Sequence, residues 1–119
     1  MNVPDRFELF VLPEGVKKVT ITPDPKILNT TTIVVQREDH TLGNALCRQL
    51  QFQEHVTFTG YRMPHPLEPA FELKIQTDGS ITPVAAAQMG ATTIQGQLAT
   101  LEDRLRTEIK RYKSVGRRI

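Results

Sequence analysis

The sequence predicts an α+β domain in which a four-stranded antiparallel sheet packs against two helices, the C-terminal one being long. Three observations support this fold class. Four short segments are β-branched or alternate between apolar and polar residues, two others carry apolar residues at spacings of three and four, and the order is strand, strand, helix, strand, strand, helix. A chain of 119 residues can build one core, so residues 1–119 are expected to form a single domain.

The two opening strands are expected within the first 38 residues. Four prolines among the first 25 residues exclude a long helix and leave room for one edge strand at residues 16–22. Residues 30–38 form the second strand, because they begin with six consecutive β-branched side chains, whose restricted rotamers suit a pleated sheet.

The first helix is expected at residues 41–53, where the apolar period lengthens to three and four. Its apolar stripe consists of Leu42, Ala45, Leu46 and Leu50. Either Asp39 or Thr41 can cap its N-terminus. Gly43 and Asn44 are poor helix formers, and we expect Gly43 to permit the close approach of another backbone.

Two further strands are expected at residues 56–62 and 70–77. In the first of them, Val56 and Phe58 alternate with Thr57 and Thr59. The second has one apolar and one polar face, as expected for a sheet with one face in water. The apolar face consists of Phe71, Leu73 and Ile75, and the polar face of Glu72, Lys74 and Gln76.

The last helix is expected to begin at Thr82 and Pro83, a good N-cap followed by a residue tolerated at the first helical position. Apolar residues then recur at spacings of three and four, at Ala87, Ala91, Ile94, Leu98, Leu101, Leu105, Ile109 and Tyr112. Such a helix could run about 30 residues and about 45 Å, beyond a sheet only about 20 Å tall. Its protruding stripe predicts a partner helix. The alternative is a helix that bends or ends near Gly90 and Gly96.

Charge is distributed unevenly, although the formal net charge is only +2. Residues 1–103 carry 8 basic and 12 acidic side chains, whereas residues 104–119 carry 7 basic and 1 acidic. This basic end consists of Arg104, Arg106, Lys110, Arg111, Lys113, Arg117 and Arg118. Its cations can complement the dipole of a helix C-terminus or dock onto an acidic neighbour. The other possibilities are a nuclear import signal and a nucleic-acid-binding module, although the latter lacks an aromatic stacking platform.

The sequence contains no arrangement typical of a catalytic or metal site. Glu38, Asp39 and His40 adjoin one another, but Cys47 lies seven residues beyond His40, whereas residues three or four apart share a helix face. The histidines and the cysteine lack zinc-ligand spacing, and no second glycine follows Gly43 as in a phosphate loop. We therefore expect no active site, no cofactor and no metal ion.

The composition favours a soluble intracellular protein. A single cysteine cannot form an internal disulfide, which fits a reducing compartment. Residues 1–10 are too polar for a signal peptide, and no apolar stretch approaches the roughly 20 residues of a membrane span.

The junction between the second strand and the first helix resembles a known signature. The run HTLGNAL from His40 to Leu46, followed by Arg48 and Leu50, resembles the first helix of alpha-type RNA polymerase assembly subunits, from the bacterial alpha N-terminal domain to archaeal subunit L and eukaryotic counterparts. The preceding Glu38 and Asp39 resemble the eukaryotic and archaeal form. Further matches lie at residues 60–66 and 71–77, and residues 1–9 are similar to the small alpha-like subunits of RNA polymerase II.

This resemblance implies a non-catalytic assembly subunit that acts in transcription in the nucleus. In that family, the small subunit forms a heterodimer with a larger alpha-like subunit through the first and last helices of each. The heterodimer is the platform for the two largest subunits. Small zinc-binding polymerase subunits are implied as further partners, and nucleic acid would be contacted only through the complex. The alternative is the equivalent subunit of another nuclear or archaeal polymerase.

The resemblance also implies two sets of site residues. The dimer interface would comprise Leu42, Leu46, Ile94, Leu98, Leu101 and Leu105. The surface facing the large subunits would comprise Glu38, Asp39, His40, Thr41, Gly43, Asn44 and Arg48. Arg48 stands where bacterial alpha subunits place an arginine important for assembly, whereas Cys47 replaces a second arginine of that pattern. A solvated helix face is the alternative for Arg48.

Overall fold

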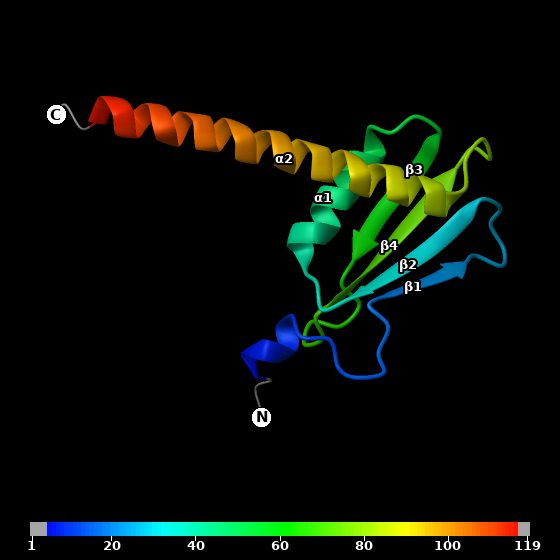
Figure 1. Ribbon diagram of the computed structural model, residues 1–119. Helices are drawn as coiled ribbons and strands as arrows, with labels where there is room; N and C mark the ends of the chain where they lie inside the picture. Colours follow the sequence, from blue (N-terminus) through cyan, green and yellow to red (C-terminus); the bar gives the residue numbers. More distant parts are fainter. Residues whose placement is uncertain (1–4, 117–119) are drawn as a thin grey trace.

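The sheet has four antiparallel strands, as predicted. In the computed structural model, which describes residues 5–116, β1 (Val19–Pro23), β2 (Thr30–Gln36), β3 (Val56–Arg62) and β4 (Ala70–Thr77) lie in the order β1-β2-β4-β3 (Figure 1). The bounds of β3 and β4 are those predicted from sequence. The predicted edge position of β1 is also confirmed, so β1 has only β2 as a neighbour.

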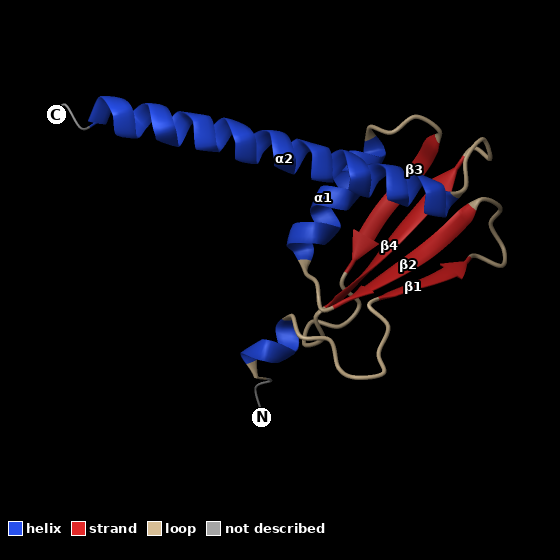
Figure 2. Cartoon of the chain, viewed as in Figure 1, coloured by secondary structure: helices blue, strands red, loops and turns tan. Residues whose placement is uncertain are grey.

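Both α-helices lie on the same face of the sheet (Figure 2). α1 (His40–Gln51) is capped by Asp39, whose Oδ1 accepts a hydrogen bond from the Thr41 backbone N–H at 2.9 Å. α2 (Pro83–Gly116) starts as predicted, because Thr82 Oγ1 accepts from the Ala85 N–H at 3.1 Å. The opposite face of the sheet remains open, which agrees with the polar alternation seen in β4.

The hydrophobic core lies between the sheet and the two helices. Its fully buried large side chains are Phe71, Leu73 and Ile75 from β4 and Leu50 from α1. Strand β2 and helix α2 complete this core with Ile33, Val35 and Ala86. The predicted apolar face of β4 is therefore confirmed.

Helix α2 continues without interruption through Gly90 and Gly96, so the alternative of an early bend or end is wrong. Gly90 is buried where α2 crosses α1, and a Cβ there would lie 3.2 Å from Leu50 Cδ2 and 3.0 Å from Gln53 Oε1. Gln53 also donates from Nε2 to the Ala86 carbonyl oxygen at 2.9 Å. Gly90 thus brings the two helices close together, whereas a Cβ at Gly96 would meet nothing within 4 Å.

The second half of α2 projects past the sheet and α1 (Figure 1). The helix has 34 residues, which corresponds to about 51 Å. The radius of gyration is 18.6 Å, compared with about 13–14 Å for a compact domain of this length. The predicted protrusion is therefore present.

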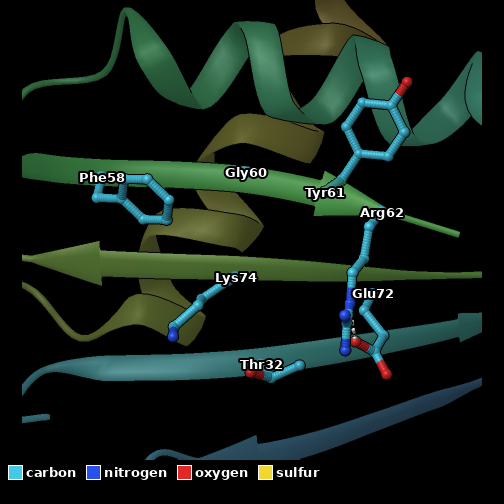
Figure 3. Close-up of a pocket in the computed structure, with 7 residues that line it drawn as sticks. All are labelled: Thr32, Phe58, Gly60, Tyr61, Arg62, Glu72 and Lys74. Atoms are coloured by element: carbon cyan, nitrogen blue, oxygen red, sulfur yellow. Dashed lines mark hydrogen bonds and ion pairs between the residues drawn. The ribbon is translucent and has the colours of Figure 1, made fainter. Parts of the chain in front are cut away.

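Two local features differ from the sequence-based expectation. A short 3-10 helix, η1 (Arg6–Leu9), occupies part of a segment expected to hold only extended chain. In β3, a bulge shifts the register between Val56 and Phe58. Thr59 and Tyr61 therefore turn toward the helices, while Phe58 lies on the open face beside Gly60 (Figure 3). The simple alternation of Val56 and Phe58 did not reveal this switch.

Candidate functional site

An apolar stripe on the projecting half of α2 is exposed to solvent. Leu98, Leu101 and Leu105 are 58%, 61% and 57% exposed. Ile94, nearer the sheet, is only partly exposed, and Ile109, Tyr112 and Val115 continue the exposed apolar surface toward the C-terminus. Fully burying a leucine contributes about 1.5–3 kcal/mol, so roughly half of that remains unrealised at each of the three leucines. Such a contiguous stripe is typical of a surface that binds another chain.

An apolar groove of about 420 Å³ lies at the other end of this stripe, above β1 and β2. Val19 and Ile21 of β1 pair with Val35 and Ile33 and therefore share their inward face. Neither helix packs closely over β1, so Val19 and Ile21 remain 46% and 48% exposed. The groove is closed on its sides by Leu42 and Leu46 of α1 and by Val84, Ala87 and Ala91 of α2.

The groove and the exposed stripe form one continuous surface, because Ala87 and Ala91 belong to the same stripe as Ile94 and Leu98. We call this surface the apolar seam. It contains all six side chains predicted for a dimer interface: Leu42, Leu46, Ile94, Leu98, Leu101 and Leu105. Sequence reasoning missed the contribution of Val19 and Ile21. Their alternation with threonines was the available signal, but only the sheet order shows that their apolar side is left uncovered.

A polar surface lies on a different side of α1. His40, Asn44 and Arg48 are exposed at spacings of four, so they follow one line along the helix. Asp39 and Thr41 are exposed at the N-terminus of the helix. The Thr41 N–H that donates to Asp39 lowers the pKa of this carboxyl from its ordinary value. The nearby Glu38 is held by Lys18 through an ion pair of 3.0 Å.

Gly43, the remaining residue of that predicted set, is buried. A Cβ at this position would lie 2.8 Å from Tyr61 Cδ2. The expected close approach to Gly43 is therefore made by an aromatic side chain, and the prediction of a backbone there is wrong. Tyr61 in turn fixes His40, whose Nδ1 lies 3.0 Å from the tyrosine hydroxyl and whose ring meets the Tyr61 ring edge-on. Gly43 thus shapes the polar surface without being exposed on it.

The cysteine and the histidine of α1 lie in different environments. Cys47 is buried against the core, whereas His40 is exposed and bonded to Tyr61. Within residues 5–116, the side chains of His, Cys, Asp and Glu form no group of three or more that could hold a metal ion. In the same range, no helix combines the length and the apolar character that crossing a membrane requires.

The basic end of α2 is exposed throughout the described residues. Arg106 pairs with Glu102 at 2.6 Å, and Arg111 lies 3.7 Å from Glu108. Arg104, Lys110 and Lys113 have no ion-pair partner among residues 5–116. Arg117 and Arg118 of the predicted basic end, like residues 1–4 of the N-terminal match, lie outside the described residues.

The open face of the sheet carries a shallow hollow of about 310 Å³ (Figure 3). Phe58 and Gly60 form one side of it, and the charged side chains around it are paired within the chain. Arg62 binds Glu72 at 3.0 Å, and Lys74 lies 3.8 Å from Asp24. The hollow therefore presents no unbalanced charge to a ligand.

The continuous apolar seam across its two helices gives this α+β domain the architecture of a dimerisation domain. The chain belongs to the RNA polymerase Rpb3/Rpb11 dimerisation domain family, whose pattern matches residues 30–104. This finding confirms the resemblance to alpha-type polymerase subunits.

The chain is similar in sequence to RNA polymerase II subunits over most of its length. It is 41% identical over 115 residues to the DNA-directed RNA polymerase II subunit rpb11 of Dictyostelium discoideum, covering 97% of this chain and 96% of the relative. It is 45% identical over 83 residues to the RNA polymerase II subunit RPB11 of Schizosaccharomyces pombe, covering 70% and 67%. The crystal structure of RNA polymerase subunit L from Thermoplasma acidophilum shares the fold, with a TM-score of 0.66, 19% identity and coverage of 82% and 96%.

Proposed function

We propose that this chain is a non-catalytic assembly subunit of RNA polymerase II that pairs with the larger alpha-like subunit. The observation that carries the proposal is the apolar seam, which runs without a break from the groove over β1 to the end of α2. The family match and the RNA polymerase II relatives support the kind of complex in which this seam is used. The complex acts in transcription, which gives the chain a nuclear location.

The seam suits two helical elements of a partner. One packs into the groove over Val19 and Ile21, between Leu42 and Ala87. The other lies along Leu98, Leu101 and Leu105, where the spacing of three and four fits a helix packed lengthwise. Both contacts bury side chains that the isolated chain leaves in water, so pairing adds the hydrophobic stabilisation that this fold lacks on its own.

The polar surface of α1 is available for a different set of partners in the same complex. His40, Asn44 and Arg48 face away from the groove that Leu42 and Leu46 line. A heterodimer formed through the seam therefore leaves these side chains free to contact the two largest subunits. Small zinc-binding subunits complete the assembly, and nucleic acid is reached only through it.

Co-expression with the larger alpha-like subunit tests this proposal. We expect a 1:1 complex, whereas the chain expressed alone should self-associate or be poorly soluble, because its seam is uncovered. A tagged chain should also recover the polymerase core from a nuclear extract. A soluble monomer that does not bind the larger subunit at micromolar concentration would refute the proposal.

A further inference from the structure

Beyond residue 103, cations border the exposed stripe of α2 on both sides, whereas Glu102 lies beside Leu98 and Leu105. Residues 104–116 contain five basic side chains and only one carboxylate, that of Glu108. Arg104 and Arg111 are seven residues apart and lie along one edge of the stripe. Arg104 follows Leu101 by three residues, and Arg111 follows Glu108 by three residues. Arg106 and Lys113 are also seven residues apart and lie along the other edge. We call these two pairs the cation rows.

We propose that the helix packed on Leu98, Leu101 and Leu105 belongs to a different chain and carries carboxylates along both of its edges, opposite the cation rows. This inference rests on the proposed function and adds the chemical character of the partner helix to it. Charged residues at the edges of a helix–helix seam set partner choice and orientation, while the apolar residues between them provide most of the affinity.

The cation rows have capacity for such a partner. Arg104 in one row and Lys113 in the other have no ion-pair partner among residues 5–116. The pairs Arg106–Glu102 and Arg111–Glu108 lie within one helix and are exposed. Exposed pairs of this kind contribute little to stability, so they can be exchanged for contacts with another chain.

The same charges disfavour a second copy of this chain over residues 104–116. In a parallel pair, the two basic ends would lie side by side at about 8–10 Å, which is close to one Debye length at physiological salt. In an antiparallel pair of the same turns, equal edges face each other, so the row of Arg104 would meet its own copy. An acidic partner helix relieves both repulsions.

Single charge reversals test the inference, with purified larger alpha-like subunit as the probe. Arg104→Glu and Lys113→Glu each reverse one edge charge. Lys110→Glu makes the same change nine residues from Leu101, or two and a half turns, on the opposite side of α2. None of the three positions packs against the sheet, and circular dichroism should confirm an unchanged fold.

We expect Arg104→Glu and Lys113→Glu each to raise the Kd of the heterodimer about tenfold at low salt, and this effect to shrink as salt is added. Lys110→Glu should change the Kd less than about threefold. Equal effects of all three variants would overturn the inference and leave the proposed function intact. Failure of the unaltered chain to bind would refute the proposed function, and the inference with it.

Two further outcomes identify another occupant of the stripe. Sedimentation of the unaltered chain as a homodimer as stable as the heterodimer would assign the stripe to a second copy. Filter binding to duplex DNA that is lost in Arg104→Glu, while affinity for the larger subunit is unchanged, would assign the cations to nucleic acid. Either result would contradict an acidic partner helix.

Discussion

At the scale of single residues, Gly43 determines how the polar surface of α1 is built around His40. The absence of a Cβ lets the Tyr61 ring lie against the first turn of α1, and the ring then positions the His40 imidazole. Tyr61 also meets the core residue Phe71 edge-on, with ring centroids 6.4 Å apart. An exposed histidine is thereby connected to the centre of the domain through one aromatic side chain.

Replacement of Gly43 by alanine should destabilise the domain by about 1–3 kcal/mol, although alanine favours helix formation. The added methyl group would lie 2.8 Å from a ring carbon of Tyr61, so the ring must move. Urea unfolding followed by circular dichroism measures the change. In a Tyr61→Leu background, the same substitution should cost less, because the obstructing ring atoms are gone. Equal costs in the two backgrounds would contradict this packing.

A second residue pair ties two turns together and gives the domain a pH dependence. His55 Nδ1, just before β3, lies 2.8 Å from Asp78 Oδ2, just after β4. The hydrogen bond with Asp78 raises the pKa of His55, and the bond with His55 lowers the pKa of Asp78. The stabilisation from His55 is thus complete below its unfolded pKa of about 6.5 and is lost as pH rises through its folded pKa. That from Asp78 is lost as pH falls through its own depressed pKa.

Proton NMR titration of His55 checks this pair. Its midpoint should lie above about 6.5 in the unaltered chain and fall toward that value in Asp78→Asn. An unchanged His55 midpoint in the variant would contradict the pairing.

The N-cap role of Asp39 could be predicted from sequence, because capping is a contact between residues two positions apart. The contact of His40 with Tyr61 could not, because it joins residues 21 positions apart and depends on the register of β3. The reason for Gly43 was therefore only half accessible: the sequence indicated a close approach but not the group that approaches.

At the scale of elements, the crossing of α1 and α2 is set by Gly90. This residue lies against Leu50 and Gln53, and Gln53 also binds the Ala86 carbonyl. In the sequence, Gly90 and Gly96 were the positions where the long helix was alternatively expected to bend or end. The helix continues through both, because a glycine loses no backbone hydrogen bond, and Gly90 also provides close packing that the sequence did not indicate.

Alanine substitutions at the two glycines should have opposite effects. Gly90→Ala should destabilise the domain by about 1 kcal/mol or more, because its Cβ would displace Gln53 or the fully buried Leu50. Gly96→Ala should stabilise it by up to about 1 kcal/mol, since only the gain in helix propensity remains. Urea unfolding of both variants at high dilution measures the difference. Stabilisation by Gly90→Ala would show that α1 and α2 do not pack as described.

The strands illustrate what periodicity can and cannot predict. The alternation in β4 correctly assigned Phe71, Leu73 and Ile75 to the core, because this strand is regular and central. In β3, the bulge after Val56 moves Phe58 to the open face. A bulge changes which side chains face inward without changing the composition of the strand, so a pattern of period two is misread across it.

At the scale of the whole molecule, the chain is a small domain with an extended arm. Its long axis measures 65 Å, and the seam continues along the projecting helix. The length and apolar period of α2 made both features predictable. The groove was not predictable, because it depends on how far the two helices leave β1 uncovered. The predicted interface residues from Leu42 to Leu105 therefore lie on a larger surface than the sequence indicated.

The measurement that tests the central proposal most directly is the mass of the complex between this chain and the larger alpha-like subunit. Two matched variants are compared with the unaltered chain. Leu98→Asp puts a charge into the seam, and Thr107→Asp puts the same charge two and a half turns away, on the opposite side of α2. Light scattering coupled to size-exclusion chromatography reports the mass of each mixture.

We expect a 1:1 heterodimer for the unaltered chain and for Thr107→Asp, and separate subunits for Leu98→Asp, because pairing would bury its carboxylate in an apolar interface. A 1:1 heterodimer formed equally well by Leu98→Asp would contradict the assignment of the exposed stripe of α2 to the partner.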